Sequence, residues 1–336
     1  MEKSVEDVVI VGAGIAGLAT ALGLHRLGIR SLVLESGDSL RTSGFALGIW
    51  TNGWRALDAL GVGDILRSKH TQLTGGRDDH DLRAVNRKML LETLETGLPK
   101  GTIRFSSKVV RIETDHHHQF NSIHLADGTV LQTKVLIGCD GVNSVVARFL
   151  GFSKPSFAGR SGVRAWWILR MAMVLSQSLC NSLERVLDTV LYHVMIAQFT
   201  GFSRLVLLPK YLKKLKYKTW PRGCVALEDS IVLARVLAKA LKEKASEKEH
   251  ERIQKGLEKY ARERRWRSID LISTAYMVGF MQQSDGVVLN FVRDKIMAKF
   301  MAGMLLKKAG FDCGKLTVLH RFCFEICIFI FFTCTT

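Results

Sequence analysis

Three glycines near the amino terminus have the spacing of a phosphate-binding turn. The stretch GAGIAG, residues 12–17, directly follows the apolar run 7–11 and precedes a segment with helical character, 18–27. The first glycine permits a tight turn, the second lets backbone amides approach a pyrophosphate, and the third lets helix and strand pack closely. The amides and the helix start would then bind the phosphates. The spacing predicts a dinucleotide site formed by Gly12, Gly14, Ile15, Ala16 and Gly17.

A carboxylate follows this turn at the distance that such a site requires. Residues 30–35, RSLVLE, form a second predicted strand, and Glu35 ends it about 18 residues after Gly17. A carboxylate in this place accepts hydrogen bonds from both ribose hydroxyls of an adenosine and disfavours a 2′-phosphate. FAD or NAD therefore fits this position better than NADP. The order strand, helix, strand and acid predicts an α/β fold with a Rossmann-like parallel sheet.

A second strand end carries polar residues into the same kind of crevice. The stretch 134–148, KVLIGCDGVNSVVAR, is an apolar strand followed by Asp140 and Gly141 and then by a helix with Ser144 and Arg148. Ligands of open α/β sheets bind at the carboxyl ends of strands. An ordinary strand–turn–helix connection is the alternative. Just upstream, alternating apolar residues in 122–131 around an Asp-Gly pair predict a hairpin.

Together these motifs resemble the class A flavoprotein monooxygenases, the para-hydroxybenzoate hydroxylase-like group, with the plant members related to zeaxanthin epoxidase and bacterial salicylate hydroxylase most similar. The resemblance implies FAD as the cofactor, NAD(P)H as the co-substrate, and hydroxylation or epoxidation of an aromatic or related small molecule. It implies that Arg41 lies before the approach to the flavin, that Arg87 opens a helix, and that the 140–148 motif contacts both FAD and NADPH. The flavin carries the chemistry in this family, so no catalytic side chain is predicted.

The middle of the chain departs from the family pattern. Family members carry a β-sheet substrate domain and then a G-D-A-x-H and G-x-G motif, whereas only about 70 residues separate Arg148 from Gly223 and neither motif is present. GCVALED, 223–229, matches only the end of that motif, which implies cofactor contacts for Cys224 and Asp229. We expect an intact adenosine and pyrophosphate end and an incomplete ring end. The alternative is a catalytically silent dinucleotide-binding remnant or splice product that acts by interaction only.

The predicted organisation is a three-layer FAD-binding Rossmann-like domain with a truncated substrate domain and a helical C-terminal part. The boundaries are a FAD-binding domain in 1–150, a truncated substrate region in 151–220, a FAD-domain helix and C-terminal helices in 221–316, and an apolar tail in 317–336. We expect the helical part to pack back on the first domain, with a helix over 225–241 and further helices near 260–268 and 275–284.

Composition narrows the function classes. Nearly half of the 336 residues are hydrophobic and only four are proline, which excludes a disordered chain. The net charge of +17 predicts solvated basic helix faces or attraction of anionic cofactors. No zinc-finger spacing or RNP motif accompanies the charge, so we expect a small-molecule substrate and no nucleic acid.

The remaining features predict neither a metal site nor a membrane span. The seven cysteines form no CxxC pair, which fits a reducing compartment, and the clusters 78–81 and 115–118 are predicted to be solvated loops without a metal. The apolar tail is shorter than the ~20 residues of a membrane-spanning helix. With no signal sequence at the start, we expect a cytoplasmic monomer or homodimer. Membrane association through the apolar tail 317–336 is the weaker alternative.

Overall fold

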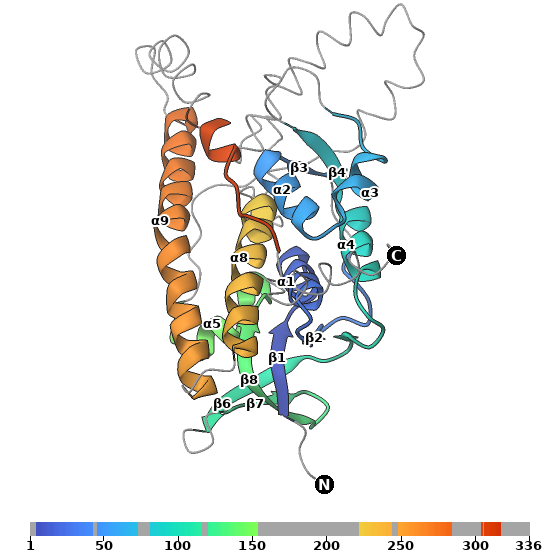
Figure 1. Cartoon of the computed structure of the whole chain (residues 1–336), viewed down its shortest axis with the longest axis vertical. Helices are drawn as coiled ribbons and strands as arrows, with labels where there is room; N and C mark the ends of the chain where they lie inside the picture. The colour runs from blue at the N-terminus through green and yellow to red at the C-terminus, as the bar shows by residue number, and fades with distance from the viewer. Residues whose placement is uncertain are drawn as a thin grey trace, which may run out of the picture.

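The structure is a computed structural model that describes residues 5–42, 46–72, 81–115, 120–153, 222–243, 248–283, 304 and 306–316 (Figure 1). Most of the predicted substrate region, the apolar tail, the three histidines 116–118 and the acidic stretch 78–80 lie outside these residues. The flanking Asp81 is described, and its carboxylate pairs with Arg67 and Arg83 at 3.0 and 2.8 Å. Among the described residues, no group of His, Cys, Asp or Glu side chains has the arrangement of a metal site.

A six-stranded sheet in the order β5-β2-β1-β8-β7-β6 forms the centre of the fold. Its strands are β1 (Val5–Val11), β2 (Leu32–Leu34), β5 (Ile103–Arg104), β6 (Val109–Asp115), β7 (Phe120–Leu125) and β8 (Val130–Gly138). β1 pairs in parallel with β2 and with β8, and Val11 lies opposite both Leu34 and Gly138. The carboxyl ends of these three strands therefore meet at one edge, where open α/β sheets bind their ligands. The predicted α/β class with a parallel sheet is confirmed.

The remaining strands bear out the hairpin prediction. β7 and β8 pair in antiparallel fashion, and Gly128 in the turn between them has a φ of +83°, which favours glycine. The amide of Thr129 donates to Asp127 Oδ1 at 2.9 Å and fixes the turn. A separate two-stranded antiparallel sheet joins β3 (Ala46–Ile49) to β4 (Arg83–Asn86).

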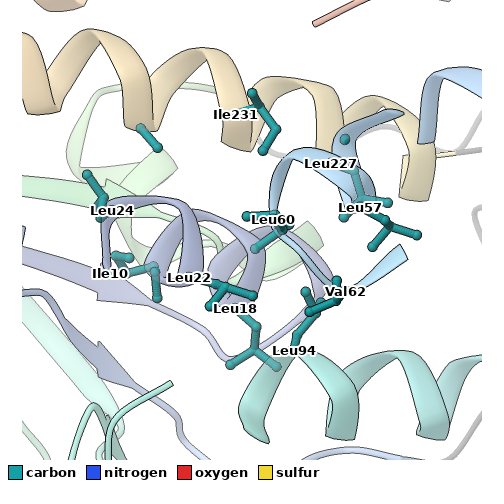
Figure 2. Close-up of a cluster of buried hydrophobic side chains, with 14 of the residues drawn as sticks. Ile10, Leu18, Leu22, Leu24, Leu57, Leu60, Val62, Leu94, Leu227 and Ile231 are labelled. Carbon is teal, nitrogen blue, oxygen red and sulfur yellow. The ribbon is translucent and has the colours of Figure 1, made fainter. Parts of the chain in front are cut away.

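The two faces of β1 enter two different hydrophobic cores. Val8 and Ile10 lie in the larger core, whereas Val9 and Val11 lie in a smaller one with side chains of β6, β7 and the helix after β8. Strict alternation of this kind is expected for a strand that is covered on both sides. The larger core gathers residues of the helices around α1, and Figure 2 shows Leu18 and Leu22 of α1 at its centre.

The helices lie around this sheet. They are α1 (Ile15–Arg26), α2 (Thr51–Ala59), α3 (Gly63–Arg67), α4 (Arg87–Thr96), α5 (Val145–Phe149), α8 (Arg222–Lys242) and α9 (Glu249–Gln283), with a short 3-10 turn at Gly141–Asn143. Within the described ranges, none of these helices is both long and apolar enough to cross a bilayer.

Helix α8 packs directly on α1, so the helical C-terminal part does return to the dinucleotide-binding half. A Cβ atom on Gly23 would lie 2.9 Å from Cβ of Ala234, which shows how closely the two helices approach. Leu227 and Ile231 of α8 belong to the same core as Leu24 of α1 (Figure 2). α9 lies along α8 on the side away from α2 (Figure 1).

Two helix predictions need correction. α8 begins at Arg222, so Gly223 and Cys224 are already helical and the predicted start at residue 225 is wrong by three residues. The segments predicted as separate helices near 260–268 and 275–284 belong to one 35-residue helix, α9, in which no proline interrupts the backbone. Arg87 does open a helix, as predicted.

Candidate functional site

The glycine turn after β1 is built as its spacing predicted. Gly12 has a φ of +100°, and a Cβ atom on it would lie 2.6 Å from the carbonyl oxygen of Cys139. A Cβ atom on Gly17 would lie 1.9 Å from the carbonyl oxygen of Gly12. These two positions therefore exclude any side chain. A Cβ atom on Gly14 would meet nothing within 4 Å, so there is open space in front of the start of α1.

The space in front of Gly14 suits an anion. Gly14 is the N-cap residue of α1, and no side chain caps this helix. The first N–H groups of a helix lack intrahelical partners and carry a partial positive charge, so they bind phosphate. Ile15 and Ala16 form the first helical positions. The residues present therefore fit a pyrophosphate at this turn.

Glu35 lies beside the turn, just after β2. Its Oε2 atom accepts a hydrogen bond from the Ala13 amide at 2.8 Å, and its Oε1 atom accepts one from the Gly37 amide at 2.9 Å. These contacts hold the carboxylate next to the second residue of the glycine stretch. This is where an adenosine ribose would lie if its pyrophosphate occupied the space in front of Gly14.

Asp140 follows β8, the other parallel neighbour of β1. Its Oδ2 atom accepts from the Val145 amide at 2.6 Å, whereas Oδ1 is buried without a hydrogen-bond partner in the described part of the chain. A buried acceptor of this kind costs free energy unless a ligand or water donates to it. Gly141 has a φ of +80° and open space around it. This strand end therefore has both an unused acceptor and room for a ligand.

The helix after Asp140 is fixed by a cap. Ser144 Oγ accepts from the Ala147 amide at 2.8 Å at the start of α5, and Arg148 lies in the last turn of the same helix. The pKa of the neighbouring Cys139 thiol is raised to about 12, chiefly by burial and also by the charge of Asp140. Cys139 is therefore a neutral, unreactive side chain beneath the turn.

Arg41 and Arg87 lie together, although 46 positions separate them in the chain. Arg87 Nη1 donates to the carbonyl oxygen of Arg41. Burial lowers the pKa of Arg87, and the charge of Arg41 lowers it further. A guanidinium whose charge is disfavoured by a neighbouring positive charge is stabilised by an anionic ligand. Arg87 is held at the start of α4 by Asn86, whose side chain accepts from the Lys88 amide at 2.9 Å.

Cys224 and Asp229 lie on different faces of α8. Cys224 Sγ is 3.6 Å from the carbonyl oxygen of Gly48 in β3, and burial raises the pKa of this thiol to about 12. Asp229 faces α9, where Arg264 Nε donates to Oδ1 at 2.5 Å. Burial raises the pKa of Asp229, and the charge of Arg264 opposes this shift. The structure thus places Cys224 against β3 and Asp229 in an ion pair.

Comparisons with known proteins agree with this arrangement. The family described as FAD dependent oxidoreductase matches residues 7–94. The chain is 37% identical to Monooxygenase 2 of Arabidopsis thaliana over 410 residues, which cover 94% of this chain and 99% of the relative. It is 30% identical to Monooxygenase 1 of the same plant, over 92% of this chain and 99% of the relative.

This chain belongs to the FAD-dependent monooxygenases. Among solved structures, Klebsiella pneumoniae HpxO complexed with FAD and uric acid has a TM-score of 0.57 at 17% identity, covering 90% of this chain and 96% of that one, which shows a shared fold. FAD is accordingly the cofactor that the site must fit. Glu35 accepts a hydrogen bond from the glycine turn, and the backbone of Cys139 and Asp140 lies close to Gly12 on the other side. Together they offer an anion-binding turn, a ribose acceptor and an unused acceptor to this monooxygenase's cofactor.

The sequence patterns missed a fully buried acid of the monooxygenase. Glu228 has no exposed surface and accepts hydrogen bonds from Asn52, Arg264 and Arg267. A signal was present: Glu228 lies four residues after Cys224, next to Asp229, in a stretch that is mostly apolar. Arg264 and Arg267 are spaced for one face of a later helix. The motif that 223–229 resembles ends in Asp229, so the prediction fell on that neighbouring acid.

Proposed function

We propose that this FAD-dependent monooxygenase uses NAD(P)H and oxygen to hydroxylate or epoxidise an aromatic or related small molecule. One observation carries the proposal: the glycine turn, Glu35 and Asp140 converge at the carboxyl ends of β1, β2 and β8. When bound, FAD supplies the redox and oxygen chemistry. The chain's own residues would bind the pyrophosphate through the start of α1 and orient the adenosine through Glu35. The positive charges of Arg41 and Arg87 would attract the anionic cofactor.

A second candidate is a FAD-binding protein without oxygenase activity. It is favoured by a specific observation: the alignment with Monooxygenase 2 spans 410 residues, more than the 336 residues of this chain, so the relative has residues with no counterpart here. The sequence also reads Trp220-Pro221 directly before α8 and Arg222 at its first position, where the family has glycines. Bulky side chains and proline restrict the close backbone approach that glycine permits. This candidate keeps the adenosine and pyrophosphate end and lacks a competent ring end.

One set of measurements on the purified full chain separates the two. A yellow protein with one FAD per chain, with NADPH oxidation and oxygen uptake that increase when aromatic acids are added, supports the monooxygenase. Stoichiometric FAD without NADPH oxidation supports the silent protein. A chain that binds no FAD contradicts both. Asp127 in the β7–β8 turn offers a matched control, since Asp127→Asn changes an acid in the turn between these strands and leaves the three strand ends unchanged.

A cytoplasmic location and a monomeric or homodimeric state also belong to the proposal. Support for the location comes from the three described cysteines, Cys139, Cys224 and Cys313, which are all free thiols. Free thiols are usual in reducing compartments. Fractionation would test the location, and light scattering of the purified chain would test the oligomeric state.

A further inference from the structure

Glu228 connects three elements that lie far apart in the sequence. Asn52 Nδ2 of α2 donates to its Oε1 atom at 2.5 Å, Arg264 Nη2 of α9 donates to Oε2 at 2.6 Å, and Arg267 Nη2 of α9 donates to Oε1 at 2.9 Å. The carboxylate has 0% exposed surface, and the Arg264 and Arg267 side chains are 4% and 13% exposed. One acid on α8 therefore holds α2 on one side and α9 on the other.

Residues of the segment 306–316 also contact Arg264 and Arg267. Arg267 Nη2 also donates to the carbonyl oxygen of Lys308 at 2.8 Å. The Phe311 ring lies 4.3 Å from the Arg267 guanidinium and 5.1 Å from that of Arg264, within the range of cation–π contacts. The segment 306–316 thus completes the packing around Glu228, and neither arginine can turn away without losing these contacts.

A gain in stability alone does not explain why Glu228, Arg264 and Arg267 form buried ion pairs. Replacing a buried ion pair by apolar side chains of similar size is often neutral or stabilising, whereas in some proteins such a buried polar group specifies one arrangement of its elements. The arrangement here concerns the start of α8. Cys224, one turn before Glu228 on the same face, is 3.6 Å from the Gly48 oxygen, and a Cβ atom on Gly53 would come within 3.0 Å of its Sγ atom. A shift of α8 along its axis would break this close packing.

The start of α8 lies at the cofactor end of the fold. Contacts of Ser230 with Ala16 and of Ala234 with Gly23 show that α8 and α1 run in the same direction. α8 begins at Arg222, eight residues or about 12 Å along the helix axis before Ser230 at 1.5 Å per residue. Because Ser230 contacts Ala16 and Thr20 in the first turns of α1, the N-terminus of α8 lies beyond the start of α1. The positive end of α8 is therefore near the glycine turn and further out than the pyrophosphate position.

We propose that Glu228 is a positioning residue that, through Asn52, Arg264 and Arg267, fixes the first turns of α8 beside the part of FAD that extends past the pyrophosphate. The inference rests on the proposed function in one respect, namely that the chain binds FAD. It predicts that loss of the Glu228 contacts weakens binding of the flavin half of FAD and leaves binding of the adenosine half unchanged. Among the described residues, no hydrogen bond or ion pair joins Glu228, Asn52, Arg264 or Arg267 to the glycine turn or to Glu35.

The test compares FAD with ADP, which probes the adenosine half alone. Two variants loosen the connection: Glu228→Gln removes the charge and keeps the shape, and Asn52→Ala removes the α2 contact without leaving a charge unpaired. Lys134→Met is the matched control, because Lys134 pairs with Glu249 of α9 and Asp7 of β1 at 3.1 and 2.8 Å and does not touch α8. Titrations measure the Kd of each ligand, and visible circular dichroism reports the surroundings of the bound flavin.

We expect both loosening variants to raise the Kd of FAD about tenfold, within the usual range of coupling between sites, and to change the dichroism of the flavin. The Kd of ADP should stay at the wild-type value, and Lys134→Met should leave both ligands unaffected. The inference is overturned by a wild-type Kd for FAD in Asn52→Ala, by equal weakening of FAD and ADP, or by the same FAD loss in Lys134→Met. If Glu228→Gln does not fold, Asn52→Ala decides. A wild-type chain that binds ADP but not FAD overturns the proposed function itself, which is a separate result.

Discussion

Gly14→Ala should separate cofactor binding from folding. The backbone of Gly14 has φ −80° and ψ −176°, an extended conformation that alanine adopts readily, and its Cβ atom would meet nothing within 4 Å. Two small effects on folding oppose each other. Alanine is a poorer N-cap than glycine, which destabilises the fold. Alanine also stabilises the fold by about 0.4–1 kcal/mol, because it lowers the conformational entropy of the unfolded chain. The free energy of unfolding should therefore change by less than about 1 kcal/mol.

The effect on FAD should be much larger than the effect on folding. The methyl group would occupy the space through which a pyrophosphate reaches the amides at the start of α1. We expect the Kd of FAD to rise at least about tenfold, which corresponds to about 1.4 kcal/mol. Flavin fluorescence titration measures the Kd, and urea unfolding followed by circular dichroism measures the stability.

Gly17→Ala is the matched comparison. Its Cβ atom would lie 1.9 Å from the carbonyl oxygen of Gly12, so the turn and α1 must move apart. Overpacking of this kind costs about 1–3 kcal/mol of stability. Gly17→Ala should lose both stability and FAD, whereas Gly14→Ala should lose FAD only. A Gly14→Ala protein that binds FAD with the wild-type Kd would refute the placement of the pyrophosphate in front of Gly14.

Three further predictions follow from single contacts. Glu35→Gln should raise the Kd of FAD about tenfold in titrations, because a neutral amide accepts more weakly from ribose hydroxyls than a carboxylate does; an unchanged Kd would contradict the ribose assignment. Ser144→Ala should lower the free energy of unfolding by about 1 kcal/mol in urea through loss of the α5 cap, and equal stability would show that the cap contributes nothing. Burial raises the pKa of the Cys224 thiol from 9.0 to about 12 in the folded chain. The thiol of the unfolded chain therefore ionises at a lower pH, and the free energy of unfolding should fall as the pH rises from 9.0 towards 12. Cys224→Ala should reduce that fall between pH 9 and 11, and an identical pH dependence would contradict the shift.

Local patterns were sufficient to predict the dinucleotide half of the molecule. The three glycines of the turn, the apolar strand before them and Glu35 lie within about 30 residues, and steric requirements fix their roles without any distant partner. The strand that ends near Asp140 was predicted for the same reason, since its burial on both faces is visible in its composition.

Interactions between distant segments were not predictable in this way. Glu228 meets Asn52 across 176 positions and Arg264 across 36, and only the packing of α2, α8 and α9 brings them together. The predicted start of α8 at residue 225 was wrong because Gly223 and Cys224 were interpreted as a turn before the helix, at the end of the family motif. Glycine and cysteine are also weak helix formers. Contacts of Cys224 with β3 and α2 hold these residues in the helix and override that preference.

A competition titration tests the central claim most directly, namely that the described residues bind FAD through its adenosine and pyrophosphate half. FAD is bound to the purified full chain and then challenged with ADP, which carries that half, or with FMN, which carries the flavin and a single phosphate. We predict that FAD binds, that ADP displaces it, and that FMN at the same concentration does not. Displacement by FMN but not by ADP, or a chain that binds no FAD, would contradict the claim.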